Sequence, residues 1–318
     1  MSIPVAIYGA TGYGGQELLR LLATHPEFTV AAALSRKQAG VSVEKVHPQL
    51  AGFYEGLEFT SPEAPLPHAI EVALLAVPHG TATVIAEKMG DRRVVDLSRD
   101  YRDNADWAYG VPETNRRNII ESRHVANPGC FATGAVLALA PLARNSMLWD
   151  DITLAQTTGS SGSGAVAKAG THHPERAQDM RAYKVLTHQH EPEVVRELRR
   201  LGASKFDLAM IPQSGSFARG IFTVAHLRTP ESVDVQALYE KFYANEPFVR
   251  IREGTPALRH VARTNFCDIA VHRRGERVVI LSAIDNLGKG MATQAIQNLN
   301  LICGIDEKAG LLAPGANL

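Results

Sequence analysis

The run Val5-Ala-Ile-Tyr-Gly9-Ala-Thr-Gly12-Tyr-Gly14-Gly15, near the start of this 318-residue chain, decides the fold. It begins as a short apolar strand, and Gln16–His25 after it has leucines at helical spacing. Glycines at this turn let the backbone approach a pyrophosphate, whose charge the helix N-terminus stabilises. The GxxGxxG spacing differs from the usual GxGxxG, so a ligand-free turn is the competing interpretation. We predict a dinucleotide site formed by Gly9, Ala10, Thr11, Gly12, Tyr13, Gly14 and Gly15.

The end of the second predicted strand indicates which dinucleotide binds. NAD sites usually place an acidic residue there for the ribose hydroxyls, whereas a basic residue suits the 2′-phosphate of NADP. Here the chain reads Leu34-Ser35-Arg36-Lys37, without an acid. We therefore predict NADP(H), bound through Ser35 and Arg36, against the alternative that Arg36 is a solvated surface charge.

Two further strand ends are expected at the same site. The apolar run Ala73–Val77 leads into Pro78, and Val94–Leu97 leads into Ser98. Ligands of open α/β sheets bind beyond the carboxyl ends of the strands. Pro78 and Ser98 are therefore predicted cofactor contacts.

The pattern along the chain predicts two domains. Apolar strands alternate with helices up to residue 130, as in a parallel sheet covered on both faces, and residues 40–67 are expected to be irregular. The strands are predicted at Val5–Tyr8, Thr29–Leu34, Glu71–Val77 and Val94–Leu97, with a helix at Thr81–Met89. A helix over Phe131–Leu142 and strands at Ile152–Thr157, Leu208–Pro212, Ile221–Leu227, Cys267–His272 and Val278–Ile284 then suggest a mixed or antiparallel sheet. We predict a Rossmann-type α/β domain at 1–130, an α+β domain at 131–287, and a segment 288–318, helical over Gly290–Cys303, that packs back on the first domain.

Composition excludes several classes of protein. With 33 basic and 33 acidic residues the net charge is zero, which gives no electrostatic footprint for nucleic acid or anionic membrane. A hydrophobic content of 45% excludes intrinsic disorder. The N-terminus lacks the features of a signal peptide, and no apolar stretch is long enough to span a bilayer. A cytoplasmic location is expected, and three scattered cysteines suit a reducing compartment.

Cys130 is the candidate nucleophile. It follows Asn127-Pro128-Gly129 and directly precedes the predicted helix. A thiol at a helix N-terminus experiences the positive end of the dipole, which favours the reactive thiolate. The alternative is a small buried hydrophobe, and we assign that role to Cys267 and Cys303, which lie in apolar runs.

The bases for this thiol are sought in a histidine-rich region. It contains His172-His173-Pro174-Glu175-Arg176 and His188-Gln189-His190. The second run could bind a metal, but no further ligand falls at a convincing zinc spacing, so no metal is expected. An acid–base histidine suits the chemistry better. The loop Gly159–Gly164, which includes Gly162, could offer N–H groups to an oxyanion or phosphate, or could simply be flexible.

With these motifs the chain resembles the N-acetyl-γ-glutamyl-phosphate reductase family, which is grouped with aspartate-semialdehyde dehydrogenase. The resemblance runs over nearly the whole length. Its motifs are Gly9-x-x-Gly12-x-x-Gly15, His47-Pro48-x-Leu50, Leu75-Ala-x-Pro78-His79-Gly80, Asp96-x-Ser98, Asn127-Pro-Gly-Cys130, His188-x-His190-x-Pro-Glu193, Pro212 to Arg219-Gly220, and Asp285-Asn-Leu-x-Lys289-Gly290.

The resemblance implies roles for these positions. Cys130 would be the thiolate nucleophile, and His188 or His190 the acid–base histidine, with His188 favoured. The other implied contacts are to substrate at Asn127, Glu193 and Arg219, and to the cofactor at Gly162, Asn286 and Lys289. It also implies a second domain of the semialdehyde dehydrogenase type that carries catalysis and dimerisation, and a homo-oligomer, dimer or tetramer.

The activity implied is NADPH-dependent reduction of an N-acylated γ-glutamyl phosphate in arginine biosynthesis, through a Cys130 thioester. Residues 172–176 resemble instead the branch that reduces a carrier-protein-linked aminoadipyl phosphate in lysine biosynthesis, which would add a small acidic carrier protein as partner. An aspartate-semialdehyde dehydrogenase and a non-catalytic NADP-binding redox sensor compete less strongly with these two interpretations.

Overall fold

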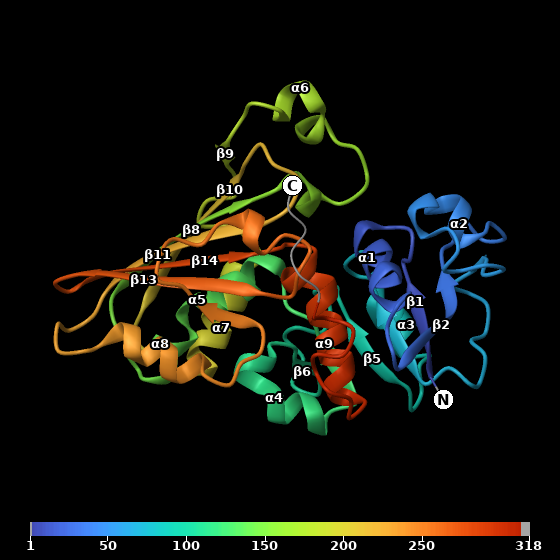
Figure 1. Ribbon diagram of the computed structural model, residues 1–318, viewed down its shortest axis with the longest axis horizontal. Coiled ribbons are helices and arrows are strands. Elements are labelled where there is room, and N and C mark those ends of the chain that lie inside the picture. The colour runs from blue at the N-terminus through green and yellow to red at the C-terminus, as the bar shows by residue number, and fades with distance from the viewer. Residues whose placement is uncertain (1, 313–318) are drawn as a thin grey trace. The chain divides into compact units, whose positions relative to one another are not determined.

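The computed structural model describes residues 2–312 and divides into two compact units. Unit 1 consists of the described residues within Met1–Gly129 and Met291–Ala313, and unit 2 of those within Cys130–Gly290. The segment 288–318, which was predicted to pack back on the first domain, includes residues 313–318, and these lie outside the described part of the chain. Figure 1 shows the elements in chain order.

The core of unit 1 is a seven-stranded sheet in the order β3–β2–β1–β4–β5–β7–β6, in which every pair of neighbours is parallel. Its strands are β1 (Ile3–Tyr8), β2 (Phe28–Leu34), β3 (Phe59–Thr60), β4 (Val72–Leu75), β5 (Arg93–Asp96), β6 (Ala108–Tyr109) and β7 (His124–Ala126). All four residues of β4 are buried, as expected for a central parallel strand covered on both faces. The predicted parallel α/β sheet is confirmed.

The helices of unit 1 are α1 (Tyr13–Leu22), α2 (Val43–Val46), α3 (Ala82–Ala86), α4 (Pro112–Glu121) and α9 (Thr293–Ile302), with a 3-10 turn η1 (Pro48–Leu50). Helix α9 packs on α1, α4 and β5, which explains why all ten of its residues are buried (Figure 1). A π-helical turn, η5 (Gly288–Ala292), precedes α9.

The prediction that 40–67 is irregular was partly wrong. Ser42 caps α2 by accepting a hydrogen bond from the Lys45 N–H at 3.3 Å, and β3 pairs in parallel with the end of β2. A two-residue strand carries too little periodicity to be recognised in a sequence, because its pairing comes entirely from the neighbouring strand.

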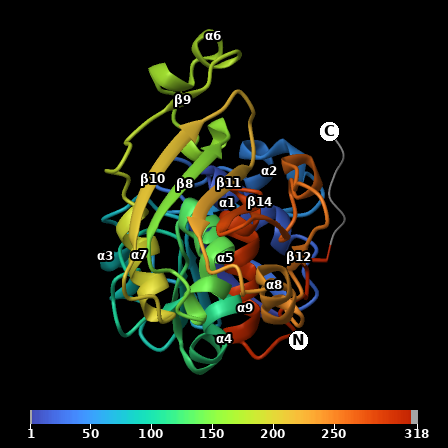
Figure 2. The ribbon, with the colours of Figure 1, turned by 90° about the vertical axis from the view of Figure 1, so that its left-hand side faces the viewer.

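Unit 2 is built on a second seven-stranded sheet, of mixed direction, in the order β12–β13–β14–β11–β8–β10–β9. Figure 2 shows β8, β10 and β11 side by side. The strands are β8 (Asp151–Thr158), β9 (Arg181–Ala182), β10 (Asp207–Ser214), β11 (Ile221–Arg228), β12 (Val249–Ile251), β13 (Cys267–Arg274) and β14 (Arg277–Ile284). The five strands predicted here are confirmed, whereas β9 and β12 were missed.

The helices of unit 2 are α5 (Cys130–Arg144), α6 (His173–Arg176), α7 (Glu191–Arg200) and α8 (Val235–Tyr243), with 3-10 turns η2 (Ser160–Ser163), η3 (Ala169–Thr171) and η4 (Leu258–His260). Helix α5 packs on β11, β14 and α7. Pro141 inside α5 cannot donate to the carbonyl of Leu137. The Tyr243 hydroxyl donates to that carbonyl instead, at 2.5 Å, which holds the buried helix in place.

Candidate functional site

In unit 1, the glycine turn between β1 and α1 is shaped by backbone contacts that exclude side chains. Gly9 has a φ of +75°, and a Cβ there would lie 2.2 Å from the Ala76 carbonyl oxygen. A Cβ on Gly15 would lie 2.4 Å from the Gly9 carbonyl oxygen. No side chain caps α1 and its first turn holds no acidic residue, so its N–H groups remain available to an anion. The turn fits a dinucleotide pyrophosphate.

Neighbouring segments hold this turn against the end of β2. The N–H groups of Gly9 and Ala10 donate to the Leu34 carbonyl at 3.1 and 3.2 Å, and Thr11 Oγ1 lies 3.4 Å from Ser35 Oγ. The buried His47 bonds through Nε2 to the Ala10 carbonyl at 3.0 Å. His47 is therefore a supporting residue that the sequence indicated only through the His47-Pro48 motif.

Arg36 lies beside this turn with a side chain that is 78% exposed. Its guanidinium pairs with Glu63, 2.5 Å between Nη2 and Oε1. An exposed ion pair of this kind contributes little to stability and is readily exchanged for another anion.

Pro78 and Ser98 follow β4 and β5, as predicted. The Ser98 hydroxyl donates to Asp96 Oδ2 at 2.8 Å and accepts from the Asp100 N–H at 3.0 Å. Burial raises the pKa of Asp96 to about 6. Asn127 is also held within unit 1, because its Nδ2 donates to the Met291 carbonyl and its Oδ1 accepts from Asn298. The roles of Ser98 and Asn127 toward ligands stay predictions.

In unit 2, Cys130 is the first residue of α5 and is half-buried. The Phe131 ring beside it packs edge-on against His188, with ring centroids 5.2 Å apart, and lies 6.1 Å from the His190 ring. The two histidine rings are themselves 4.8 Å apart. The fold thus brings both predicted histidines to the start of the helix that carries the predicted nucleophile.

His188 is 6% exposed, and burial, followed by the positive charge of Lys184, lowers its pKa to about 4. Its Nδ1 accepts a hydrogen bond from the His190 N–H at 3.2 Å, so a neutral His188 carries its proton on Nε2. His188 is therefore neutral at pH 7 and presents a donor at Nε2.

The low pKa of His188 makes acid stability testable. Burial disfavours the protonated His188 ring in the folded state. The free energy of unfolding is therefore expected to decrease as the pH falls from 6.5, the pKa of the ring in the unfolded chain, toward about 4, its pKa in the folded protein. We expect Lys184→Ala to raise the His188 pKa, since it removes a neighbouring positive charge. Titration of the histidine ring protons by NMR measures this, and an unchanged or lower pKa would contradict it.

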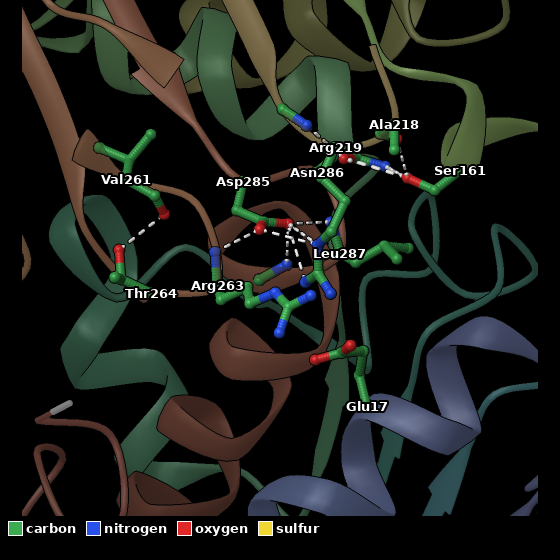
Figure 3. Close-up of polar contacts among 12 residues, drawn as sticks. Glu17, Ser161, Ala218, Arg219, Val261, Arg263, Thr264, Asp285, Asn286 and Leu287 are labelled. Atoms are coloured by element: carbon green, nitrogen blue, oxygen red, sulfur yellow. Dashed lines mark hydrogen bonds and ion pairs between the residues drawn. The ribbon is translucent and has the colours of Figure 1, made fainter. Parts of the chain in front are cut away.

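A buried carboxylate, that of Asp285, organises a second group of residues in unit 2. Asp285, with no exposed side-chain area, accepts from Arg219 Nε at 3.0 Å and Nη2 at 3.1 Å (Figure 3). It also accepts from the backbone N–H groups of Arg263, Leu287 and Gly288, at 2.5, 2.8 and 2.9 Å. The Arg219 guanidinium, 17% exposed, is thereby held in one orientation.

The turn that begins at Asp285 also packs against Cys130, the predicted nucleophile. The Gly290 N–H donates to the Asp285 carbonyl at 2.8 Å, and a Cβ on Gly290 would lie 2.9 Å from Cys130 Cβ. Lys289 is fully buried, with its ammonium 5.8 Å from the Phe248 ring centre. Asp285 therefore links the position of Arg219 to the backbone packed on Cys130, a role that no spacing in the sequence indicated.

Asn286 ties two loops of unit 2 together. Its Oδ1 accepts from the Gly220 N–H at 2.7 Å, and its Nδ2 donates to Ser161 Oγ at 3.0 Å. Ser161 in turn donates to the Ala218 carbonyl (Figure 3), so the loop that contains Gly162 is ordered rather than freely flexible. Contacts of Gly162, Asn286 and Lys289 with a cofactor stay predictions, as does substrate binding by Glu193, which is buried on α7.

Over residues 2–312, no group of His, Cys, Asp and Glu side chains is arranged to hold a metal ion. In the same part of the chain, no helix is long and apolar enough to cross a membrane.

Comparison with known proteins identifies the family. The sequence model described as "Semialdehyde dehydrogenase, NAD binding domain" matches residues 4–122, and "Semialdehyde dehydrogenase, dimerisation domain" matches residues 130–286. N-acetyl-gamma-glutamyl-phosphate reductase of Methanocaldococcus jannaschii is 42% identical over 98% of this chain and 99% of its own length. The protein of that name from Methanoregula boonei is 45% identical over 98% of each chain. This chain belongs to the N-acetyl-γ-glutamyl-phosphate reductase family.

Solved structures agree with the fold of this reductase family member. Aspartate semialdehyde dehydrogenase II from Vibrio cholerae superimposes with a TM-score of 0.76 at 19% identity, covering 96% of this chain and 99% of that one. The Candida albicans enzyme solved with NADP gives 0.74 at 14% identity, covering 95% and 99%. The α/β fold with an NAD-binding domain and a semialdehyde dehydrogenase-type second domain is confirmed.

Proposed function

We propose that this enzyme reduces N-acetyl-γ-glutamyl phosphate to the semialdehyde with NADPH, releasing phosphate, as a step of arginine biosynthesis. The observation that carries the proposal is the cluster of His188, His190 and Phe131 at the start of α5, where Cys130 lies. A helix N-terminus and a neighbouring base are what a thiol nucleophile requires.

The chemistry follows from this cluster. Cys130 gives its proton to a histidine and attacks the acyl phosphate carbonyl, and phosphate leaves with that proton, so a thioester remains on Cys130. When bound, NADPH supplies the hydride that reduces this thioester. The C–S bond then breaks, the aldehyde leaves, and the returning thiolate takes a proton from solvent.

Of the two histidines, we favour His188 as the proton carrier. Its ring is closer to Phe131 than that of His190, 5.2 against 6.1 Å. At pH 7 it is neutral, as a base must be, and the bond from the His190 N–H at 3.2 Å is long enough to be given up. The imidazolium formed would be stabilised by the thiolate and by the substrate phosphate.

Arg219 is the proposed anchor for an anionic group of the substrate. Asp285 holds its guanidinium through Nε and Nη2, so the planar group is pre-oriented before substrate binds. A guanidinium can form two parallel hydrogen bonds with a carboxylate or phosphate. Glu193, on α7 of the same unit, is proposed to contribute to this substrate site, and Asn127 stays a predicted substrate contact.

The cofactor is proposed to bind at the glycine turn, with its pyrophosphate on the N-terminus of α1 and its 2′-phosphate on Arg36. Arg36→Ala is then expected to raise KM for NADPH about tenfold and to leave KM for NADH nearly unchanged, because only the 2′-phosphate loses a charged partner. Steady-state kinetics with both cofactors measure this, with Lys37→Ala as the neighbouring control. Equal losses with the two cofactors would contradict the assignment.

The experiment that tests the proposed function is an assay in the oxidative direction with NADP and phosphate. We expect reduction of NADP with N-acetylglutamate semialdehyde and little with aspartate semialdehyde. A preference for a carrier-linked aminoadipate semialdehyde would instead assign the enzyme to the lysine branch, and no turnover of any semialdehyde would indicate a redox sensor. The relatives' names do not favour the lysine branch, a redox sensor or a carrier-protein partner.

We also propose that the enzyme acts in the cytoplasm as a homo-oligomer. On the face of the unit 2 sheet opposite α5, Ile211, Ala155, Val224 and Leu281 form a half-buried apolar row across β10, β8, β11 and β14. An apolar row that extends across four neighbouring strands is a suitable contact surface for a second copy of the same domain. The mass in solution tests this.

A further inference from the structure

Tyr183 lies in a segment that is clamped to β10. Its N–H donates to the Pro212 carbonyl at 3.0 Å, and the Leu186 N–H donates to the Met210 carbonyl at 3.1 Å. Within this segment Lys184 and Leu186 have φ angles of 47° and 57°, in the left-handed region that residues with side chains avoid. Such strain persists where the surrounding structure enforces it, and it clusters at functional sites. Here it lies directly between Tyr183 and His188.

The Tyr183 ring belongs to the cluster around Cys130. It meets the His188 ring nearly at right angles, with centroids 5.7 Å apart. The His188 ring therefore contacts two aromatic rings, those of Tyr183 and Phe131. Tyr183 and Cys130 are also close enough to influence each other electrostatically. The strained segment therefore places the Tyr183 ring against His188, within the electrostatic reach of Cys130.

The hydroxyl of Tyr183 forms no hydrogen bond with any other residue that the structure describes. This contrasts with the buried tyrosines Tyr54, Tyr239 and Tyr243, whose hydroxyls each donate to a backbone carbonyl at 2.5–2.6 Å. Burial, followed by the charge of a Cys130 thiolate, raises the pKa of Tyr183 well above its usual range. The phenol thus stays protonated at neutral pH and can donate one hydrogen bond.

We propose that Tyr183 is a further catalytic residue, whose hydroxyl donates a hydrogen bond to the substrate oxygen that becomes negatively charged at the carbon bonded to Cys130 Sγ. That oxygen carries charge when the thiolate adds to the carbonyl and again after hydride reaches the thioester. Tyr183 keeps its proton throughout, so the balance of the reaction is unchanged. A donor aimed at developing charge lowers both barriers. This inference rests on the proposed function.

The test is Tyr183→Phe in the full-length enzyme, assayed with N-acetylglutamate semialdehyde, NADP and phosphate. We expect kcat to fall about 100-fold, as for loss of one oxyanion donor, while KM for NADP stays within about threefold. Because the hydroxyl has no bond within the described chain, the melting temperature should not change. In this variant the rate of Cys130 alkylation by iodoacetamide, and its pH dependence, should be the same as in the parent enzyme. The reason is that the proposed hydrogen bond of Tyr183 is to the substrate oxyanion and not to the Cys130 thiolate.

Tyr239→Phe is the matched control. It removes a phenol that donates to the Ala138 carbonyl in the core of unit 2, so it should lower the melting temperature and leave kcat unchanged below the transition. If the parent enzyme is active and the Tyr183→Phe variant is fully active too, the role of Tyr183 is refuted and the proposed function is not. A shift of the alkylation profile to higher pH in Tyr183→Phe would also overturn it, by assigning Tyr183 to the thiolate. A parent enzyme without activity would refute the proposed function itself.

Discussion

Cys130→Ser is expected to lower the rate of reduction by more than about a thousandfold. Serine retains the shape of the side chain, but its hydroxyl ionises far less readily than a thiol. The helix N-terminus and a single histidine then cannot supply a useful concentration of nucleophile. Any ester that did form would also accept hydride more slowly than a thioester. NADPH binding, which we assign to the glycine turn of unit 1, should be retained.

Cys303→Ser provides the matched control. Cys303 is half-buried like Cys130, but burial raises the pKa of its thiol to about 11, so it carries no thiolate at neutral pH. That variant should retain full activity. Stopped-flow detection of phosphate release and fluorescence titration with NADPH separate chemistry from cofactor binding. Substantial reduction by Cys130→Ser would refute the assignment of the nucleophile.

Asp285→Asn is expected to have the second largest effect, lowering the free energy of unfolding by about 3–5 kcal/mol. The amide removes the charge opposite Arg219 and directs an NH2 group at partners that are all donors. It also releases the 285–290 turn packed on Cys130. We therefore expect kcat/KM to fall as well, through misplacement of Arg219 and of the nucleophile. Urea unfolding and steady-state kinetics measure the two losses.

Asp268→Asn separates stability from activity in this experiment. Asp268 is equally buried and pairs with Arg250 at 2.6 Å between Oδ1 and Nε, in a strand without a proposed catalytic role. It should destabilise the fold without lowering kcat at a temperature where the protein is folded. If Asp285→Asn affected stability alone, Asp285 would be a purely structural residue.

The parts of the fold that could be predicted are those with a local signal. The β1–turn–α1 unit was recognisable because glycines at 9 and 15 are required by backbone contacts within a few residues or with the adjacent strand. The long strands of unit 2 were recognisable as apolar, strand-like runs. By contrast, α4, α7 and α8 were not identified, although the amphipathic character of α7 and α8 becomes clear once their buried faces are known. The buried face of α4 includes Glu113, Thr114 and Asn115, so its sequence carries no apolar stripe.

The sequence by itself determined the family and the glycine turn, and it predicted the nucleophile and the two candidate histidines, because each depends on residue types at short spacings that follow from chemistry. Only the tertiary structure decided that Asp285 holds Arg219, that burial keeps His188 neutral, and that Tyr183 lies against His188. These features join segments up to 66 residues apart or depend on the exclusion of water. The spacing of residues along the sequence predicts neither which distant residues come into contact nor which side chains are buried.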